Sequence, residues 1–266
     1  VEGVHFPPGI APEHVGHRVL AVNLSDLAAM GAEPAWALLT LTLPRADEEW
    51  LARFAAGLGA LAARHGTALV GGDTTSGPLT ASVAVAGFVE PGRALTRAGA
   101  RPGDGLFVSG WPGEAAAGLA VLQGRIGGGD PGARGRLAAR FLRPEPRVAL
   151  GRALGGSASA CIDLSDGLAG DLAKLCEASG VGADLLGEAL PVSADLAGCA
   201  GTGEARRLLL TGGDDYELLF TLPPGTWAPD EAAAGVRVTR IGTVREGAGI
   251  SLDGAPLARD LAHGFD

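Results

Sequence analysis

A stretch without hydrophobic periodicity, residues 91–104, divides the sequence into two parts that each carry helix and strand patterns. Proline, glycine and arginine fill this stretch, as is typical of a boundary between domains. A chain of 266 residues has room for one large domain or two small ones. Since neither part alternates regularly between strand and helix, we predict an α+β fold rather than a doubly wound sheet. The predicted domains are residues 1–95 and residues 104–266.

Hydrophobic spacing predicts particular elements on both sides of this boundary. Pro12 opens an apolar stripe of helical spacing that ends at Gly31. Asp47 is predicted to cap a second helix, with two glutamates in its first turn. The strands expected in the first part span residues 35–43, 67–70 and 80–89. The elements expected in the second part are strands at 106–109, 158–164, 216–222 and 236–244 and helices at 113–123, 145–154 and 166–179.

Composition excludes several broad classes of protein. Hydrophobic residues make up 47% of the chain and charged residues 19%, which excludes intrinsic disorder. No apolar run reaches the ~18 residues of a transmembrane helix without a charge or a proline. The net charge of −9 argues against nucleic acid or an anionic membrane surface as a partner. Three cysteines outside any CxxC pair favour a reducing, cytoplasmic compartment.

A single lysine, Lys174, stands against 20 arginines, and this count restricts the chemistry of the chain. A Walker P-loop needs a lysine after GxxxxG, and no such loop precedes Lys174. Protein-kinase chemistry also needs a phosphate-binding lysine. Schiff-base catalysis away from Lys174 is excluded as well. If the chain handles phosphates, the positive charge must come from arginine or from a metal ion.

Two aspartates lie where a predicted strand meets a predicted helix, in the segment Asp163-Leu164-Ser165-Asp166-Gly167. Asp163 and Ser165 occupy alternate strand positions, so their side chains can point the same way. Asp166 follows at the turn, beside the helix N-terminus. Carboxylates in oxygen-rich turns suit Mg²⁺, which usually shares its shell with substrate phosphates. The simpler interpretation is structural, with Asp166 as a helix cap and Asp163 as a strand-end acid.

Three further segments place acidic residues among small or apolar ones. Residues 71–77 read Gly-Gly-Asp-Thr-Thr-Ser-Gly, and the glycines would let the backbone of this predicted loop approach a phosphate. Residues 212–217 repeat Gly-Gly-Asp with more acidic neighbours. Asp26 interrupts an apolar helix, where a charge needs a partner or a metal. The two glycine segments are also compatible with ordinary turns, but together the four acidic clusters predict a metal–phosphate site.

The order of these segments resembles the thiamine-monophosphate kinases, a family in the superfamily that includes aminoimidazole ribonucleotide synthetase. The similarity rests on residues 1–6 with His5, on Asn23-Leu24-Ser25-Asp26-Leu27-Ala28-Ala29-Met30-Gly31-Ala32, and on the motifs at 71–74, 162–168 and 213–218. It covers essentially the whole chain. It implies ATP-dependent phosphorylation of thiamine monophosphate to thiamine diphosphate with several Mg²⁺ ions. The implied fold is a two-domain, synthetase-like α+β fold with an N-terminal sheet-forming dimerisation domain and a C-terminal α/β domain.

The resemblance also implies roles for single residues, carried over motif by motif. The implied metal ligands are Asp26, Asp73, Asp163 and Asp166. The implied ATP contacts are Gly72, Asp73, Arg97 and Ser165. The implied thiamine phosphate contacts are His5, Asp214 and Phe265. No residue is predicted as a general base, because the acceptor is a phosphate monoester that is already a nucleophile.

Two features depart from the family pattern. The family usually has Glu where Asp214 stands, and it carries an acidic metal-binding stretch before His5 that is absent here. Because the sequence opens in mid-pattern on Val1, without a signal peptide, we expect upstream residues to be missing and the first domain to be incomplete. We also predict a homodimer joined through the first domain, whose strands 35–43 and 80–89 look apolar on both faces.

Other functions stay open at this point. Within the superfamily these are aminoimidazole ribonucleotide synthetase, selenophosphate synthetase and the hydrogenase-maturation dehydratase. The last two need a reactive cysteine that none of the three cysteines convincingly supplies. An alternative of another class is a non-catalytic Mg²⁺–nucleotide-binding paralogue. The predicted enzyme uses Mg²⁺ and ATP, is cytoplasmic, and binds neither nucleic acid nor membranes.

Overall fold

The smaller of two β-sheets is formed by the first third of the chain. The computed structural model describes residues 1–226 and 228–257. In this sheet the strand order is β2-β1-β3, and the central strand pairs in parallel with β2 and antiparallel with β3. The strands are β1 Glu33–Leu43, β2 Ala68–Ser76 and β3 Thr80–Phe88.

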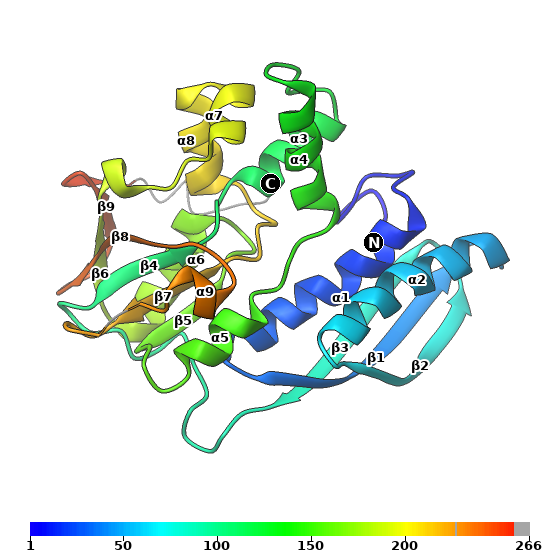
Figure 1. Ribbon diagram of the computed structural model, residues 1–266, viewed down its shortest axis with the longest axis horizontal. Helices are drawn as coiled ribbons and strands as arrows, with labels where there is room; N and C mark the ends of the chain where they lie inside the picture. The colour runs from blue at the N-terminus through cyan, green and yellow to red at the C-terminus, as the bar shows by residue number, and fades with distance from the viewer. Residues whose placement is uncertain (227, 258–266) are drawn as a thin grey trace.

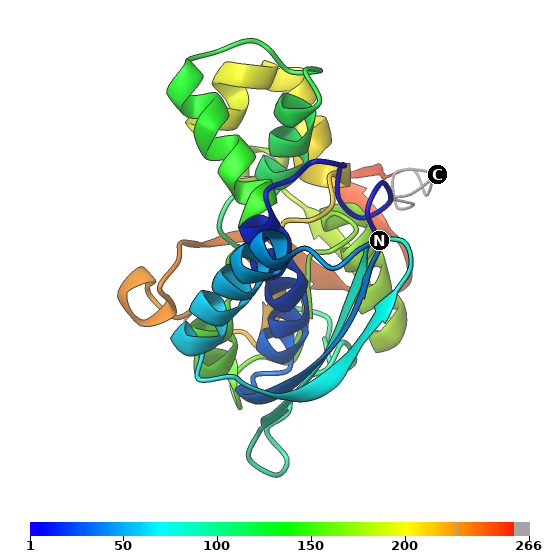
Figure 2. The ribbon, with the colours of Figure 1, turned by 90° about the vertical axis from the view of Figure 1, so that its right-hand side faces the viewer.

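Two helices, α1 Pro12–Ala29 and α2 Glu48–Arg64, cover one face of this sheet (Figures 1 and 2). The carboxylate of Asp47 caps α2 by accepting a hydrogen bond from the Trp50 N–H at 3.0 Å, as the sequence predicts. Aliphatic and aromatic side chains of the helices and strands form the core between them, including Leu24, Leu41, Phe54 and Leu61.

The other face of this sheet is open to solvent. Alternate residues of β1 point away from the helices, so Trp36 and Leu38 are 40% and 47% exposed. Every residue of β2 is exposed, including Leu69 and Val70, and among the strands of residues 1–226 and 228–257 β2 pairs only with β1. The face and the β2 edge therefore present apolar side chains and unpaired backbone groups in the isolated chain.

The larger sheet has seven strands in the order β10-β9-β6-β8-β4-β7-β5. Its neighbours pair antiparallel except for β6 and β9, which are parallel. The central strands are almost completely buried, because helices and loops cover them on both sides. The strands are β4 Gly105–Ser109, β5 Ala160–Asp163, β6 Gly182–Leu185, β7 Leu218–Leu222, β8 Val238–Arg245, β9 Ile250–Leu252 and β10 Ala255–Pro256.

Helices surround the larger sheet, and four of them (α3, α4, α7 and α8) form a group at the top of Figure 1. Helix α1 packs against both α5 and β5, so it lies between the two sheets. The helices are α3 Glu114–Leu122, α4 Pro131–Leu142, α5 Val148–Leu154, α6 Leu168–Ser179, α7 Ala194–Ala200, α8 Thr202–Thr211 and α9 Glu231–Ala234, with a short 3₁₀ helix, η1, at Gly187–Ala189.

The α+β class predicted from the sequence is confirmed, but two local expectations were wrong. The glycine-rich residues 124–135, which lie between the expected helices 113–123 and 145–154, were assigned no element from the sequence, yet Asp130 and Pro131 open helix α4, which buries Leu137 and Phe141. Residues 71–77 were expected as a loop, yet Gly71 to Ser76 continue strand β2 in register with β1. Residues 91–104 contain no helix or strand. No helix in the described part of the chain is long and apolar enough to span a membrane.

Candidate functional site

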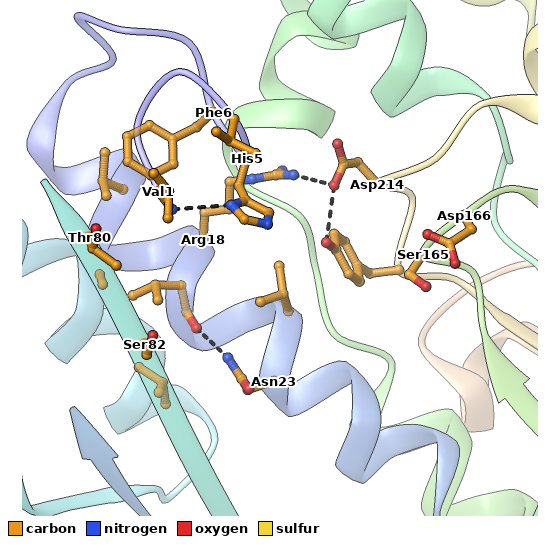
Figure 3. Close-up of a pocket in the computed structure, with 17 residues that line it drawn as sticks. Val1, His5, Phe6, Arg18, Asn23, Thr80, Ser82, Ser165, Asp166 and Asp214 are labelled. Atoms are coloured by element: carbon orange, nitrogen blue, oxygen red, sulfur yellow. Dashed lines mark hydrogen bonds and ion pairs between the residues drawn. The ribbon is translucent and has the colours of Figure 1, made fainter. Parts of the chain in front are cut away.

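A cavity of about 550 Å³ lies between helix α1, strand β3 and two loops of the larger sheet (Figure 3). One loop is residues 164–167, which follows β5, and the other is residues 212–217, which follows α8. Apolar side chains of the N-terminal segment and of α1 form much of its wall: Val1, Val4, Phe6, Val15, Val19 and Val22. Its polar lining comprises His5, Arg18, Asn23, Thr80, Ser82, Ser165, Asp166, Asp214 and Tyr216.

The loop at residues 212–217 has an unusual backbone. Asp214 and Tyr216 have φ values of 70° and 53°, a region that residues other than glycine rarely adopt and that often marks functional sites. The Asp214 N–H donates to the Ser165 carbonyl oxygen at 2.9 Å, and the Tyr216 N–H donates to that of Leu164 at 2.8 Å. A Cβ on Gly213 would lie 2.6 Å from the Ser165 oxygen, so glycine permits this approach. The two acidic motifs therefore form one structural unit.

Two neighbouring acids anchor this loop from behind. The carboxylate of Asp215 accepts hydrogen bonds from the N–H groups of Gly113 and Ala115 at the start of α3, at 2.6 and 3.1 Å. Burial raises the pKa of the Asp215 carboxyl. Glu217 receives two hydrogen bonds from Arg147, at 2.7 and 2.5 Å, and both side chains are at least nine-tenths buried. These bonds fix the ends of the loop and leave the Asp214 and Tyr216 side chains facing the cavity.

Asp214, a predicted acceptor contact, lies at the polar end of the cavity (Figure 3). Its Oδ1 accepts a hydrogen bond from the Tyr216 hydroxyl at 3.1 Å and forms an ion pair with Arg18. The Tyr216 phenol is neutral at physiological pH, since burial and the Asp214 charge raise its pKa. The structure thus adds an arginine and a tyrosine to the carboxylate that the sequence predicts.

Asp26 and Asp163, two of the predicted metal ligands, lie close to each other on α1 and β5. Burial raises the pKa of Asp163 to about 6, and the charges of Asp26 and Asp171 add to the rise, while a hydrogen bond from Ser25 Oγ at 2.7 Å opposes it. Partial burial also raises the pKa of Asp26, against the charge of Arg97. Neither carboxylate forms an ion pair in residues 1–226 or 228–257.

Asp166, the third predicted ligand, already has a cationic partner. Its carboxylate forms an ion pair with Lys174, the only lysine in the chain, and the same ammonium group contacts Asp171 at 2.8 Å. Asp171 in turn accepts a hydrogen bond from the Asp166 N–H at 2.9 Å. This network neutralises Asp166 at the edge of the cavity, so the structural interpretation of this acid has support alongside the functional one.

Asp73 and Gly72 lie apart from the cavity. They are on β2, whereas the cavity is lined by β3, on the opposite side of β1. Asp73 is exposed, and its Oδ1 accepts a hydrogen bond from the Thr74 N–H at 2.9 Å. Gly72 has φ 146°, and a Cβ there would come within 1.7 Å of the Leu39 carbonyl oxygen. The close approach of β1 therefore requires glycine at position 72, independently of any contact with a ligand.

The remaining predicted residues are distributed as follows. Ser165 and His5 line the cavity together with Asp166 and Asp214. Arg97 is exposed in the segment before β4, near enough to Asp26 for its charge to oppose the rise in that pKa. Phe265 lies outside the described residues.

The four predicted metal ligands are not assembled into one group. Across the described residues, no cluster of three or more histidine, cysteine, aspartate or glutamate side chains is arranged to hold a metal. The pair Asp26 and Asp163 nevertheless fits Mg²⁺, because two unneutralised carboxylates with raised pKa values provide oxygen ligands that lack a cation. Proteins commonly bind Mg²⁺ through one or two carboxylates, with substrate phosphates and waters completing the shell.

Arg18 and Tyr216, the two cavity residues that contact the Asp214 carboxylate, were not predicted as site residues from the sequence. Arg18 lies within a helical apolar pattern, where an arginine is ordinarily solvated, so nothing in the sequence marks it as buried. Tyr216 did carry a signal, since it is the only tyrosine of the chain and lies inside the acidic segment 212–217. Its position close to Asp214 in that segment is the signal that could have placed Tyr216 among the predicted acceptor contacts.

The two parts of the chain match the two domains of one family. The family described as AIR synthase related protein, N-terminal domain, matches residues 1–89, and AIR synthase related protein, C-terminal domain, matches residues 101–254. Fold and site thus define the class as that of the AIR synthase related proteins. At the level of fold alone, E. coli HypE, a hydrogenase maturation protein, is similar at TM-score 0.75 and 20% identity.

Relatives within this class are considerably closer. A thiamine-monophosphate kinase of Salmonella typhimurium is 48% identical over 272 residues, which covers all of this chain and 83% of that protein. One of Haemophilus influenzae is 40% identical over 275 residues, with the same coverage. The chain therefore belongs to the thiamine-monophosphate kinase family, as the sequence motifs predict.

Solved structures agree with this assignment. The crystal structure of thiamine-monophosphate kinase from Stenotrophomonas maltophilia K279a is similar at TM-score 0.90 and 43% identity, over 96% of this chain and 83% of that one. A structure described as AaThiL complexed with AMPPCP and TMP is similar at TM-score 0.87 and 36% identity, over 96% and 81% of the two chains.

Proposed function

We propose that this protein transfers the terminal phosphoryl group of ATP to the phosphate of thiamine monophosphate, giving thiamine diphosphate and ADP. The observation that carries the proposal is the 48% identity to a thiamine-monophosphate kinase along the whole chain. A relative at 36% identity is described in complex with AMPPCP, an ATP analogue, and TMP. The cavity beside Asp214 supplies a place for such an acceptor in this chain.

The chemistry of the acceptor suits the two ends of the cavity. Thiamine monophosphate carries an aminopyrimidine, a cationic thiazolium ring and a phosphate. We assign the rings to the space between the valines of α1 and Tyr216, with Asp214 as the anionic partner of the amino group or of the thiazolium. His5 and Phe265 are further proposed acceptor contacts. We assign the phosphate to the loop that carries Ser165 and Asp166.

The donor side of the site is proposed beside the cavity, one turn of α1 beyond Val22 and Asn23. Asp26 and Asp163 would hold Mg²⁺, with Asp73 and Asp166 as further ligands. ATP would contact Gly72, Asp73, Ser165 and Arg97, whose planar fork matches a phosphate. When bound, Mg²⁺ supplies the positive charge that lets two polyanions approach each other.

The transfer itself needs no general base from the protein. The acceptor phosphate is largely dianionic at neutral pH, so its oxygen can attack without losing a proton first. What the chain contributes is orientation of acceptor and donor for in-line displacement, which is the main protein contribution in phosphoryl transfer. The loops at 164–165 and 212–217 would provide this orientation. The first carries the proposed donor contact Ser165, the second carries the proposed acceptor contact Asp214, and backbone hydrogen bonds join the two loops.

A homodimer formed through the smaller sheet is part of the same proposal. Trp36, Leu38, Leu69, Val70 and Phe88 are each at least 40% exposed on this sheet, and large exposed apolar areas often mark protein–protein interfaces. A second copy would cover these side chains and the open β2 edge. It would also change the surroundings of Asp73, which the isolated chain leaves exposed. Light scattering at micromolar concentration should give twice the monomer mass, and a monomer would contradict the proposal.

A cytoplasmic location is likewise proposed, since the reaction draws on ATP and all three cysteines are free thiols.

The enzymatic proposal is tested by a coupled ADP-release assay on the full-length protein with ATP, Mg²⁺ and one acceptor at a time. We expect release with thiamine monophosphate. Release only with formylglycinamidine ribotide would identify an aminoimidazole ribonucleotide synthetase instead. Binding of Mg²⁺–ATP without turnover of any acceptor would support the non-catalytic alternative.

A further inference from the structure

Arg18 lies in the middle of α1 but is bound by groups from the far side of the cavity. Its side chain is only 8% exposed. Nη1 donates to the Phe141 carbonyl oxygen at the end of α4, at 2.6 Å, and Nη2 forms an ion pair with Asp214. The guanidinium carbon lies 4.2 Å from the centre of the Phe141 ring and 5.8 Å from that of Tyr216.

The two carboxylate oxygens of Asp214 differ in their contacts. Oδ1 accepts from both Arg18 and Tyr216. Within the described residues Oδ2 accepts no hydrogen bond, and the Asp214 side chain is 24% exposed at the cavity. The ion pair with Arg18 and the hydrogen bond from Tyr216 both hold the side chain at Oδ1. Arg18 therefore leaves one oxygen fixed and the other free for a ligand.

We propose that Arg18 is a positioning residue for the acceptor: it orients Asp214 so that Oδ2 receives a hydrogen bond from an amino-bearing, cationic heteroaromatic ligand, and it keeps the Tyr216 ring beside that ligand. The inference rests on the proposed function for the identity of this ligand, thiamine monophosphate. Arg18 is too buried to be a principal ligand contact itself, and it acts through Asp214. An arginine suits this role, because its planar fork can bind a carboxylate and a carbonyl at once while its face packs on aromatic rings.

The test compares Michaelis constants for the two substrates in Arg18→Met and Arg18→Lys variants of the full-length protein. Methionine keeps much of the apolar stem but removes the donors and the charge. We expect Arg18→Met to raise KM for thiamine monophosphate at least 20-fold and to change KM for ATP less than 2-fold. Lysine keeps the charge and should recover part of the loss. Arg143→Met, which removes an exposed arginine at the end of α4, is the matched control and should leave both constants unchanged.

A double-mutant cycle separates positioning from general packing. If Arg18 acts through Asp214, adding Arg18→Met to Asp214→Asn should weaken acceptor binding less than 2-fold further. Equal losses for both substrates, or full additivity with Asp214→Asn, would overturn the inference. If Arg18→Met fails to fold in a thermal melt, Arg18→Lys carries the test: a higher KM for thiamine monophosphate with an unchanged KM for ATP supports the inference, and equal changes in both constants, or no change, overturn it.

Failure of the proposed function gives a different pattern. A wild-type protein that binds thiamine monophosphate in calorimetry but does not phosphorylate it would overturn the function, and the Arg18 variants would then be compared by their dissociation constants. A wild-type protein that turns over thiamine monophosphate with unchanged Arg18→Met constants would overturn this inference alone. A wild-type protein that does not bind it at all would contradict both.

Discussion

Replacing Asp163 with asparagine should stabilise the protein without Mg²⁺ while it removes activity. Asp163 is 7% exposed, and burial together with the neighbouring carboxylates raises its pKa from an ordinary value of 3.8 to about 6. The folded state therefore holds the Asp163 proton more tightly than the unfolded state does. Between pH 4 and 6 the folded state binds more protons, so the free energy of unfolding falls as pH rises through this window.

The size of the effect follows from the two pKa values. A rise from 3.8 to about 6 corresponds to at most about 3 kcal/mol at neutral pH, taking about 1.36 kcal/mol per pKa unit. Asparagine removes the charge but keeps the shape, and its Oδ1 can still accept the hydrogen bond that Ser25 donates. Asp163→Asn should therefore gain up to this amount at pH 7, and nothing below pH 4.

The assay is urea denaturation of both proteins at several pH values, in the presence of a chelator and again with Mg²⁺. The wild-type midpoint should fall between pH 4 and 6, and the variant midpoint should stay level. Added Mg²⁺ should stabilise the wild type, because an ion bound only by the folded state shifts the equilibrium, and should affect the variant much less. A variant that is less stable than the wild type at pH 7 without Mg²⁺ would refute the reasoning, since Asp163 would then have a structural rather than a metal-binding role.

Three further substitutions test other parts of the account. Asp73→Asn and Asp166→Asn should each lower turnover at least ~10²-fold with an unchanged melting temperature, because each removes a charge from a proposed metal ligand; near-normal turnover at saturating Mg²⁺ would instead favour cap and turn roles. Arg147→Met should destabilise the fold by about 3–5 kcal/mol in denaturant titration, since it leaves the buried Glu217 carboxylate without its cationic partner. The exposed ion pair between Arg152 and Glu33 supplies the control, and Arg152→Met should lower the free energy of unfolding by less than about 1 kcal/mol.

Local signals in the sequence were sufficient for most of the smaller sheet and its helices. The cap at Asp47 and the apolar stripe from Pro12 act within a few residues, so they are readable from the sequence. Helix α4 was missed because its glycines weaken the helical pattern, while its stability comes from burying Leu137 and Phe141 against other helices.

The candidate site was predictable where motifs are contiguous and not where contacts are distant. Asp214 was found because it belongs to an acidic segment, and the Ser165 motif because it ends a strand. Arg18 was missed because its partners, Phe141 and Asp214, lie 123 and 196 residues further along the chain. The place of Asp73 also depends on strand order, since β2 and β3 flank β1 on opposite sides.

Identification of the product by mass is the most direct test of the central claim. Full-length protein is incubated with ATP, Mg²⁺ and an equimolar mixture of thiamine and thiamine monophosphate, and the products are resolved by mass spectrometry. The account predicts thiamine diphosphate formed from the monophosphate, with far less phosphorylation of thiamine, because the hydroxyl of thiamine must lose a proton on transfer whereas the phosphate of the monophosphate is already an anionic nucleophile. Thiamine phosphorylated as readily as its monophosphate, or no thiamine diphosphate at all, would contradict it.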